Sequence, residues 1–95
     1  MKTYTAYFNR FDLELPAQAI ADCHHTGRCD SDVAFWEPQI DLSAIDPDDI
    51  RAELEECGAW DDSELANDQD NRERLIWIAA GNIQEEDPDW AQVSC

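Results

Sequence analysis

The sequence predicts a single α+β domain that is mostly helical, with a small N-terminal β-strand or hairpin. The 95 residues are enough for one modest core and too few for two. An alternating apolar pattern opens the chain, and segments with helix-starting and helix-ending residues follow it. Hydrophobic residues make up 43% of the chain, which is typical of a folded protein and not of a solvating acidic tail.

The N-terminal segment predicts the sheet. From residue 3 to residue 15 apolar and polar residues alternate, and Tyr4 and Phe8 fall on one face with the alanine between them. The segment Asn9-Arg10-Phe11-Asp12 is expected to turn the chain into a second short strand that ends before Pro16.

Two short helices are expected next. The segment 16–23 has a helix-forming composition with proline at its first position, and Gly27 is expected to end this helix. Asp30 or Ser31 can cap a second helix. Pro38 stops it, because the residue before a proline avoids the helical region.

Strong helix signals surround the segment 47–57. Asp46 is an acidic cap, and Pro47 stands in the first turn together with further acids near the positive end of the helix dipole. Apolar residues recur every three or four positions, and Gly58 supplies the stop.

Two frames that resemble capping boxes predict the remaining helices. The frame 61–64 is expected to start a short helix, and the frame 70–73 a longer helix that ends at Gly81. The acidic segment 84–95 is expected to form a flexible tail unless Trp90 docks on the domain.

Charge is the unusual feature of the chain. The 23 acidic and 6 basic residues leave a formal net charge of -17, which excludes nucleic acid and anionic membranes as direct partners. Residues 1–40 contain 6 acids and 3 bases, whereas the rest contains 17 acids and 3 bases. We therefore expect a cationic partner, such as a metal, a small base or a basic protein surface.

The helix over 47–57 is expected to carry a carboxylate stripe. Asp49, Glu53 and Glu56 recur at i, i+4 and i+7 beside the apolar row. Acids near a helix C-terminus oppose the dipole by ~0.3–1 kcal/mol each, and like charges at i, i+4 cost ~0.2–0.5 kcal/mol per pair. Only Arg51 is available within this helix to offset them. Helix stability does not explain these acids, so they are assigned either to a partner or to a solvated face that maintains solubility.

Metal, cofactor and catalytic sites are not expected. Cys23, His24, His25 and Cys29 are of zinc-binding type, but their spacing is not that of a standard zinc site. The acidic runs around residues 46–49 and 68–70 lack the glycine and glutamate of an EF-hand loop. No nucleophile elbow, phosphate loop or zinc-protease helix is present in the sequence, so we expect no enzyme.

No apolar run follows the first residues, so neither a signal peptide nor a membrane span is expected. We expect a cytoplasmic protein with reduced thiols. Among the four tryptophans, Trp60 is expected to be an exposed aromatic that could stack on an incoming arginine, and the others are expected to be core anchors.

Residues 52–62 (AELEECGAWDD) and 71–83 (NRERLIWIAAGNI) resemble small acidic proteins of phages and plasmids. In size and charge the chain is similar to anti-CRISPR and anti-restriction DNA mimics. The resemblance implies a DNA-mimic inhibitor whose target is a CRISPR surveillance complex or a restriction enzyme of the bacterial host. An acidic adaptor or antitoxin that neutralises a basic protein without imitating DNA is the alternative hypothesis.

A rigid array of carboxylates can imitate DNA because duplex DNA carries one charge per ~1.7 Å of axis and helical residues present charges ~5–6 Å apart. Carboxylates also accept bidentate arginine, as phosphates do. The residues expected to contact the partner are Asp46, Asp48, Asp49, Glu53, Glu56, Trp60, Asp61, Asp62, Glu64, Asp68 and Asp70.

Overall fold

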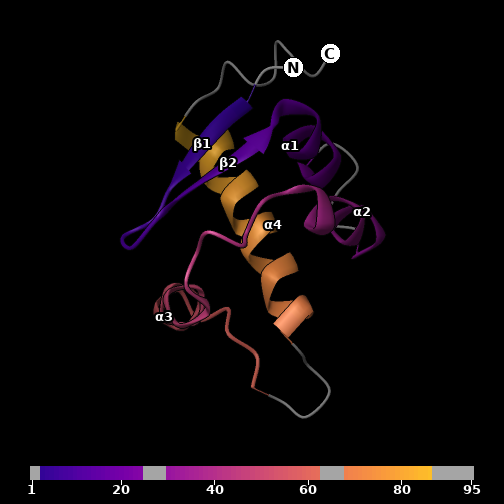
Figure 1. The fold of residues 1–95 in the computed structure, drawn as a ribbon. Helices are drawn as coiled ribbons and strands as arrows, with labels where there is room; N and C mark the ends of the chain where they lie inside the picture. Colours follow the sequence, from indigo (N-terminus) through magenta and orange to yellow (C-terminus); the bar gives the residue numbers. More distant parts are fainter. Residues whose placement is uncertain (1–2, 25–29, 63–67, 87–95) are drawn as a thin grey trace.

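The computed structural model describes residues 3–24, 30–62 and 68–86, and it confirms the α+β prediction (Figure 1). The elements in chain order are β1 (Thr3–Tyr7), β2 (Asp12–Pro16), α1 (Ala17–His24), α2 (Asp30–Trp36), the 3-10 helix η1 (Glu37–Gln39), α3 (Pro47–Glu56) and α4 (Asp68–Glu86). The two strands form an antiparallel hairpin at the start of the chain.

The hairpin buries one of its faces. Residues directly opposite each other in an antiparallel pair lie on the same face. Tyr4 pairs with Leu15, and Ala6 pairs with Leu13. All four of these side chains are buried. The N–H of Phe8 donates to the carbonyl oxygen of Phe11 at 2.9 Å and closes the turn. The predicted turn and second strand are therefore confirmed, with the proline at position 16 as the last strand residue.

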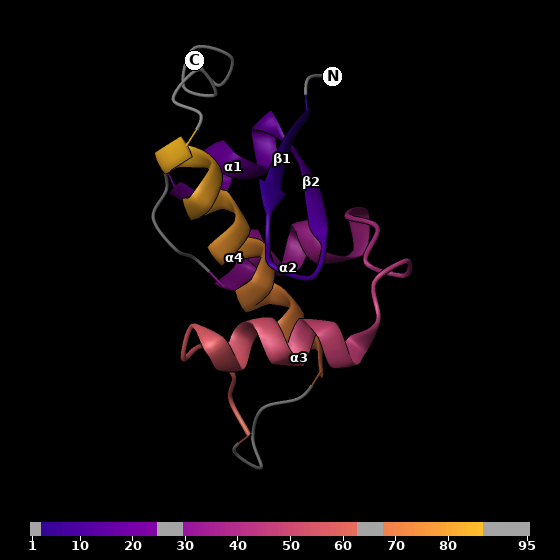
Figure 2. The same cartoon turned by 90° about the vertical axis from the view of Figure 1, so that its left-hand side faces the viewer.

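Helix α4 is the central element, and it contacts every other helix and strand that the structure describes. Figure 1 shows it passing behind the hairpin, with α1 and α2 along its length, and Figure 2 shows α3 across its N-terminal half. Its buried hydrophobic residues recur at helical spacing and form one stripe: Leu75, Ile76, Ala79, Ala80 and Ile83. This stripe meets the inward face of the hairpin and the apolar side of α1 in a single core.

The prediction that the last helix ends at Gly81 is wrong, because α4 continues to Glu86. Ile83 lies one turn beyond Ala79 and is 2% exposed, so ending the helix at the glycine would take it out of the core. Burying an isoleucine contributes ~1.5–3 kcal/mol, whereas a glycine inside a helix costs only ~1 kcal/mol. Residues 84–86 of the expected tail are therefore helical, and 87–95 lie outside the described residues.

The two short helices are confirmed, but α1 begins at Ala17, because Pro16, the expected first residue, pairs with Thr3 in the sheet. Helix α2 ends at Trp36, and Pro38 lies in η1, as expected for a residue that cannot continue an α-helix. The indole Nε1 of Trp36 donates to the carboxylate of Asp22 at 3.0 Å, which ties α2 to α1. Gly27 lies outside the described residues. In the frame 61–64, the first two residues are not helical and the other two lie outside the described ranges.

The C-terminal end of α3 follows the expected pattern. Gly58 adopts a φ of 74°, a left-handed conformation that glycine reaches without strain. The N–H of Gly58 donates to the carbonyl of Glu55 at 3.2 Å, and that of Ala59 to the carbonyl of Leu54 at 2.8 Å. These two bonds form a Schellman motif, which satisfies carbonyl groups left over at the end of the helix.

Candidate partner-binding surface

Most residues of the predicted acidic surface lie at one end of the molecule. Helix α3 crosses the N-terminal half of α4 at this end, and the segment 57–62 leads from α3 toward the start of α4 (Figures 1 and 2). Asp70 lies in the first turn of α4, and Asp68 is the first residue of that helix. Glu64 lies outside the described residues.

Among the predicted acids of this end, the exposed ones that form no ion pair belong to the start of α3 and to the segment that follows it. Asp46, Asp48 and Asp62 are exposed, whereas Asp49 and Asp70 are partly buried. The side chain of Asp46 accepts a hydrogen bond from the N–H of Asp48 at 2.9 Å, so the predicted cap is confirmed. The cap keeps one carboxylate in a defined place on the surface.

Arg51 lies among these exposed acids. It pairs with Glu55 one turn later at 2.8 Å, on a side of α3 that both residues share. The pKa of Arg51 is raised, first by the hydrogen bond that it donates to Glu55 and also by the negative charges of Asp62 and Asp48. One guanidinium therefore faces three carboxylates, and this side of α3 stays negative.

The predicted stripe of Asp49, Glu53 and Glu56 does not form an exposed row. Glu53 is 6% exposed, and its Oε1 accepts hydrogen bonds from the backbone N–H of Arg10 at 2.7 Å and from Nη1 of Arg10 at 3.3 Å. Glu53 is therefore not an exposed, partner-facing member of the predicted stripe, because its carboxylate holds the hairpin turn against α3. Sequence reasoning missed Arg10, which lies 43 positions away along the chain.

Glu56 shares Arg10 with Glu53 but remains half-exposed. Its Oε1 accepts from Nη2 of Arg10 at 2.7 Å, and its Oε2 accepts from Nδ2 of Asn9 at 3.3 Å. The hydrogen bonds from Arg10 and then Asn9 lower the pKa of Glu56. The contacts with Glu56, and then those with Glu53, raise the pKa of Arg10. Two carboxylates surround one guanidinium, so the cluster of Arg10, Glu53 and Glu56 keeps one net negative charge.

Trp60 is not the exposed aromatic that the sequence suggested. It is partly buried and packs against the core. The guanidinium carbon of Arg51 lies 5.0 Å from the centre of its ring, within the range of a cation–π contact. An arginine of the protein itself thus takes the position that we assigned to an arginine of the partner.

Asp61 is tied to α4 by side chains that sequence reasoning did not single out. The buried Asn71 donates to the carbonyl oxygen of Asp61 at 3.3 Å and accepts from its N–H at 3.1 Å. Arg74 donates to the carboxylate of Asp61 at 3.0 Å and to the carbonyl of Ala59 at 3.2 Å. These bonds hold the segment after α3 in place, and they neutralise one of the predicted partner-binding acids.

The arginines of the described residues are all engaged within the fold. Arg10, Arg51 and Arg74 pair with carboxylates at 2.7–3.3 Å, and Arg72 lies 3.9 Å from Glu37. The exposed acids at the start of α3 therefore have no guanidinium of their own beyond Arg51. Their charge is directed to the solvent or to a partner.

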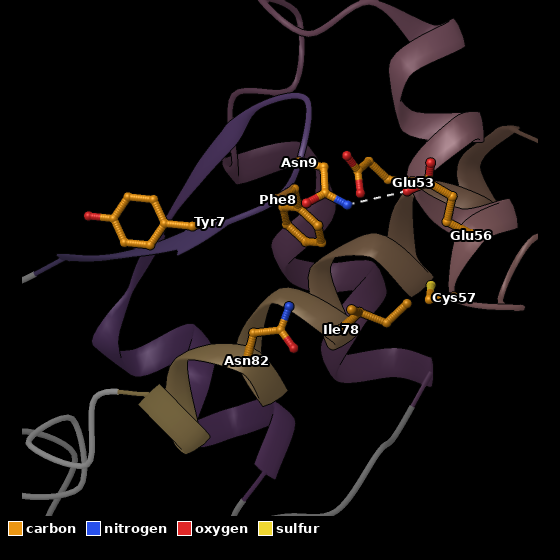
Figure 3. A pocket seen from close by; sticks show the side chains of 8 residues that line it. All are labelled: Tyr7, Phe8, Asn9, Glu53, Glu56, Cys57, Ile78 and Asn82. Atoms are coloured by element: carbon orange, nitrogen blue, oxygen red, sulfur yellow. Dashed lines mark hydrogen bonds between the residues drawn. The ribbon is translucent and has the colours of Figure 1, made fainter.

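A groove lies beside the cluster of Arg10, Glu53 and Glu56. It has a volume of about 320 Å³ and is formed by the hairpin turn, the C-terminal end of α3 and one side of α4. Figure 3 shows the residues that line it, which are Tyr7, Phe8, Asn9, Glu53, Glu56, Cys57, Ile78 and Asn82. Because they come from three distant segments, no local sequence pattern indicated this groove.

The cysteine and histidine cluster of the sequence falls largely outside the description. Cys23 is buried on α1, whereas His25 and Cys29 lie in the segment 25–29, which the structure does not describe. In the ranges that are described, no group of three or more His, Cys, Asp or Glu side chains is placed to hold a metal ion.

None of the helices in residues 3–24, 30–62 and 68–86 has the length and apolar character that crossing a bilayer requires.

Comparisons of the chain with protein-family models, with curated proteins and with solved structures found no match.

Proposed function

We propose that this protein is a non-enzymatic inhibitor that binds a nucleic-acid-binding site of another protein in place of DNA. The observation that carries the proposal is the set of exposed acids Asp46, Asp48 and Asp62 at the α3 end. They form no ion pair with any residue that the structure describes. The arginine that lies near them, Arg51, is hydrogen-bonded to Glu55. A basic surface supplies the missing counter-charge.

The hydrogen bonds around these acids support an array of carboxylates in fixed positions rather than a set of freely moving side chains. Asp46 is held by its bond to the N–H of Asp48, and Asp62 follows directly on the clamped residue Asp61. Fixed carboxylates can occupy positions that phosphates take on a basic groove, and they accept the same bidentate arginine contacts. Under this proposal the protein acts in the cytoplasm of a bacterial host on a CRISPR surveillance complex or a restriction enzyme.

Displacement of DNA tests the proposal. Fluorescently labelled duplex DNA is bound to purified restriction enzymes and CRISPR surveillance complexes, and the protein is titrated in while anisotropy is followed. We expect displacement from at least one complex, and we expect it to weaken steeply as salt rises, because the association depends on charge complementarity. Failure to displace DNA from any such complex contradicts the proposal.

A pair of matched variants separates a localised surface from bulk charge. The triple variant Asp46→Asn, Asp48→Asn, Asp62→Asn removes three charges at the α3 end, and asparagine retains the cap at position 46. The control Glu14→Gln, Glu85→Gln, Glu86→Gln removes three exposed charges from β2 and the far end of α4. We expect the first triple to weaken displacement at least about tenfold, and the control to weaken it much less. Equal losses mean that the target senses only net charge.

The alternative is an acidic adaptor or antitoxin that neutralises a basic protein without imitating DNA. The groove beside Glu53 and Glu56 favours this alternative. Phe8 and Ile78 give the groove apolar walls, and a surface that imitates only the phosphates of DNA does not need such walls. A basic partner that binds the protein tightly while keeping its bound DNA supports this alternative over the inhibitor.

A further inference from the structure

The groove beside Glu53 and Glu56 combines two chemical characters. Phe8 and Ile78 supply apolar surface, and in Figure 3 their side chains approach the space between the hairpin turn and α4. The carboxylates of Glu53 and Glu56 lie toward the α3 side of the same space. Its volume of about 320 Å³ is at the small end of the ~300–1,000 Å³ typical of ligand sites.

The charge of the groove is incompletely neutralised. Arg10 is the one cation bonded to Glu53 and Glu56 in the described residues, which leaves one net negative charge. Glu56 is 49% exposed, and each of its oxygens accepts one hydrogen bond, from Arg10 or from Asn9. A carboxylate has about four acceptor positions, so Glu56 can accept from a second guanidinium without losing Arg10.

We propose that this groove receives an arginine side chain from a basic partner protein. The methylene stem packs along Phe8 and Ile78, and the guanidinium reaches Glu56. Long cationic side chains combine an apolar stem and a charged head in this order, and arginine is more weakly hydrated than lysine and better suited to carboxylate pairing. The assignment rests on the proposed function in that both require a basic partner, but it concerns a separate surface.

Other occupants fit less well. A metal ion would have to displace Arg10 from both carboxylates, and the groove offers only Cys57 as a further strong ligand among its lining residues. A second copy of the chain would bring another net charge of -17 to an already negative site.

The test maps the binding of a short probe by NMR. Acetyl-Gly-Arg-Gly-amide is titrated into the 15N-labelled protein, and the same peptide with citrulline, which is neutral and has nearly the same shape, serves as the reference. We expect saturable shifts at the amides of Phe8, Cys57, Ile78 and Asn82 with the arginine peptide and none with citrulline. Shifts centred on Asp46, Asp48 and Asp62, or no saturable shifts, overturn the assignment.

Two charge-matched variants of α4 provide the control. Asn82→Lys places a cation in the groove, where it competes with the probe, whereas Gln84→Lys adds the same charge at an exposed position that does not line the groove. We expect Asn82→Lys to weaken binding of the arginine peptide about fivefold or more and Gln84→Lys less than about twofold, a difference of at least roughly 0.5 kcal/mol. Equal effects overturn the groove assignment.

The two proposals fail separately. If the arginine peptide binds in the groove but the protein displaces no DNA, the inhibitor proposal falls and the groove stands. If DNA is displaced and the triple variant at Asp46, Asp48 and Asp62 abolishes that activity while the probe avoids the groove, the groove assignment falls and the inhibitor proposal stands.

Discussion

Glu53 is the residue whose role differs most from its expected one. On the sequence it belongs to a row of acids that weakens its own helix through like-charge repulsion and an unfavourable dipole. In the structure it is buried and accepts two hydrogen bonds from Arg10, one of them from the backbone. A buried acceptor that serves a backbone N–H contributes more than exposed repulsion removes. Glu53 therefore stabilises the fold despite the excess of negative charge.

The first prediction tests this role. Glu53→Ala leaves the N–H of Arg10 without its acceptor and is expected to lower the free energy of unfolding by ~1–3 kcal/mol, measured by urea denaturation. Glu53→Gln retains an oxygen at the same place and is expected to lower the free energy of unfolding by a smaller amount. The exposed Glu55, on the same helix, provides the comparison. If Glu55→Ala and Glu53→Ala have the same effect, Glu53 does not hold the turn.

The second prediction concerns pH and Glu56. Because contacts with Arg10 and Asn9 lower the pKa of Glu56 in the folded state, its stabilising contribution is present above the unfolded pKa. This contribution is lost as pH falls through the lowered, folded pKa. The melting temperature of the wild type should therefore exceed that of Glu56→Gln at pH 7, and the two should converge in acid.

A double-mutant cycle isolates this effect. In an Arg10→Gln background the main partner of Glu56 is gone, so Glu56→Gln should have little effect on the melting temperature at either pH. A difference that persists unchanged in this background would show that the pH dependence arises from another carboxylate.

At the scale of the element, α3 is defined by its two ends. The Asp46 cap and the proline at its first position start it, and Gly58 in a left-handed conformation ends it. The C-terminal end of α3 also affects the surface. The chain continues from it through Trp60 to Asp61, whose backbone is hydrogen-bonded to Asn71 of α4. A shift at this end would move the acids on both sides of it.

The third prediction tests the end of α3. A Cβ at Gly58 would meet no atom within 4 Å, so Gly58→Ala has only the cost of the left-handed backbone. We expect a loss of ~1–2 kcal/mol in the free energy of unfolding, and a smaller loss for Gly58→Asn, since asparagine tolerates this conformation. Thermal unfolding of both variants measures the difference, and an alanine variant as stable as the wild type contradicts the left-handed cap.

At the scale of the whole molecule, repulsion between the negative charges acts against the compact folded state. A net charge of -17 on 95 residues repels itself and favours expansion, while the single core around α4 holds the elements together. The ion pairs bring individual carboxylates close to arginines but leave the balance strongly negative. The protein therefore folds with unneutralised acids on its surface.

The fourth prediction follows from this repulsion. Raising monovalent salt from about 0.02 M to about 0.2 M shortens the screening length to below about 10 Å, and the melting temperature should rise. The same salt weakens the exposed ion pairs, but each of these contributes only ~0–1 kcal/mol. A melting temperature that stays constant or falls over this range contradicts the expectation that charge repulsion lowers the stability of the fold.

The sequence alone determined the features that depend on neighbours along the chain. The hairpin follows from period-two alternation, and the start and end of α3 follow from Asp46, Pro47 and Gly58, because caps and turns are set by hydrogen bonds within a few residues. The excess of acid and its concentration after residue 40 were also evident from the sequence.

Only the tertiary structure decided which acids the fold itself uses. Arg10 meets Glu53 across 43 positions, and Arg74 meets Asp61 across 13, so no helical or strand period indicates either pair. The continuation of α4 past Gly81 likewise depends on burying Ile83 in a core built from distant segments. Packing brings such residues together, and the free energy of burial and pairing then overrides the local preferences that the sequence displays.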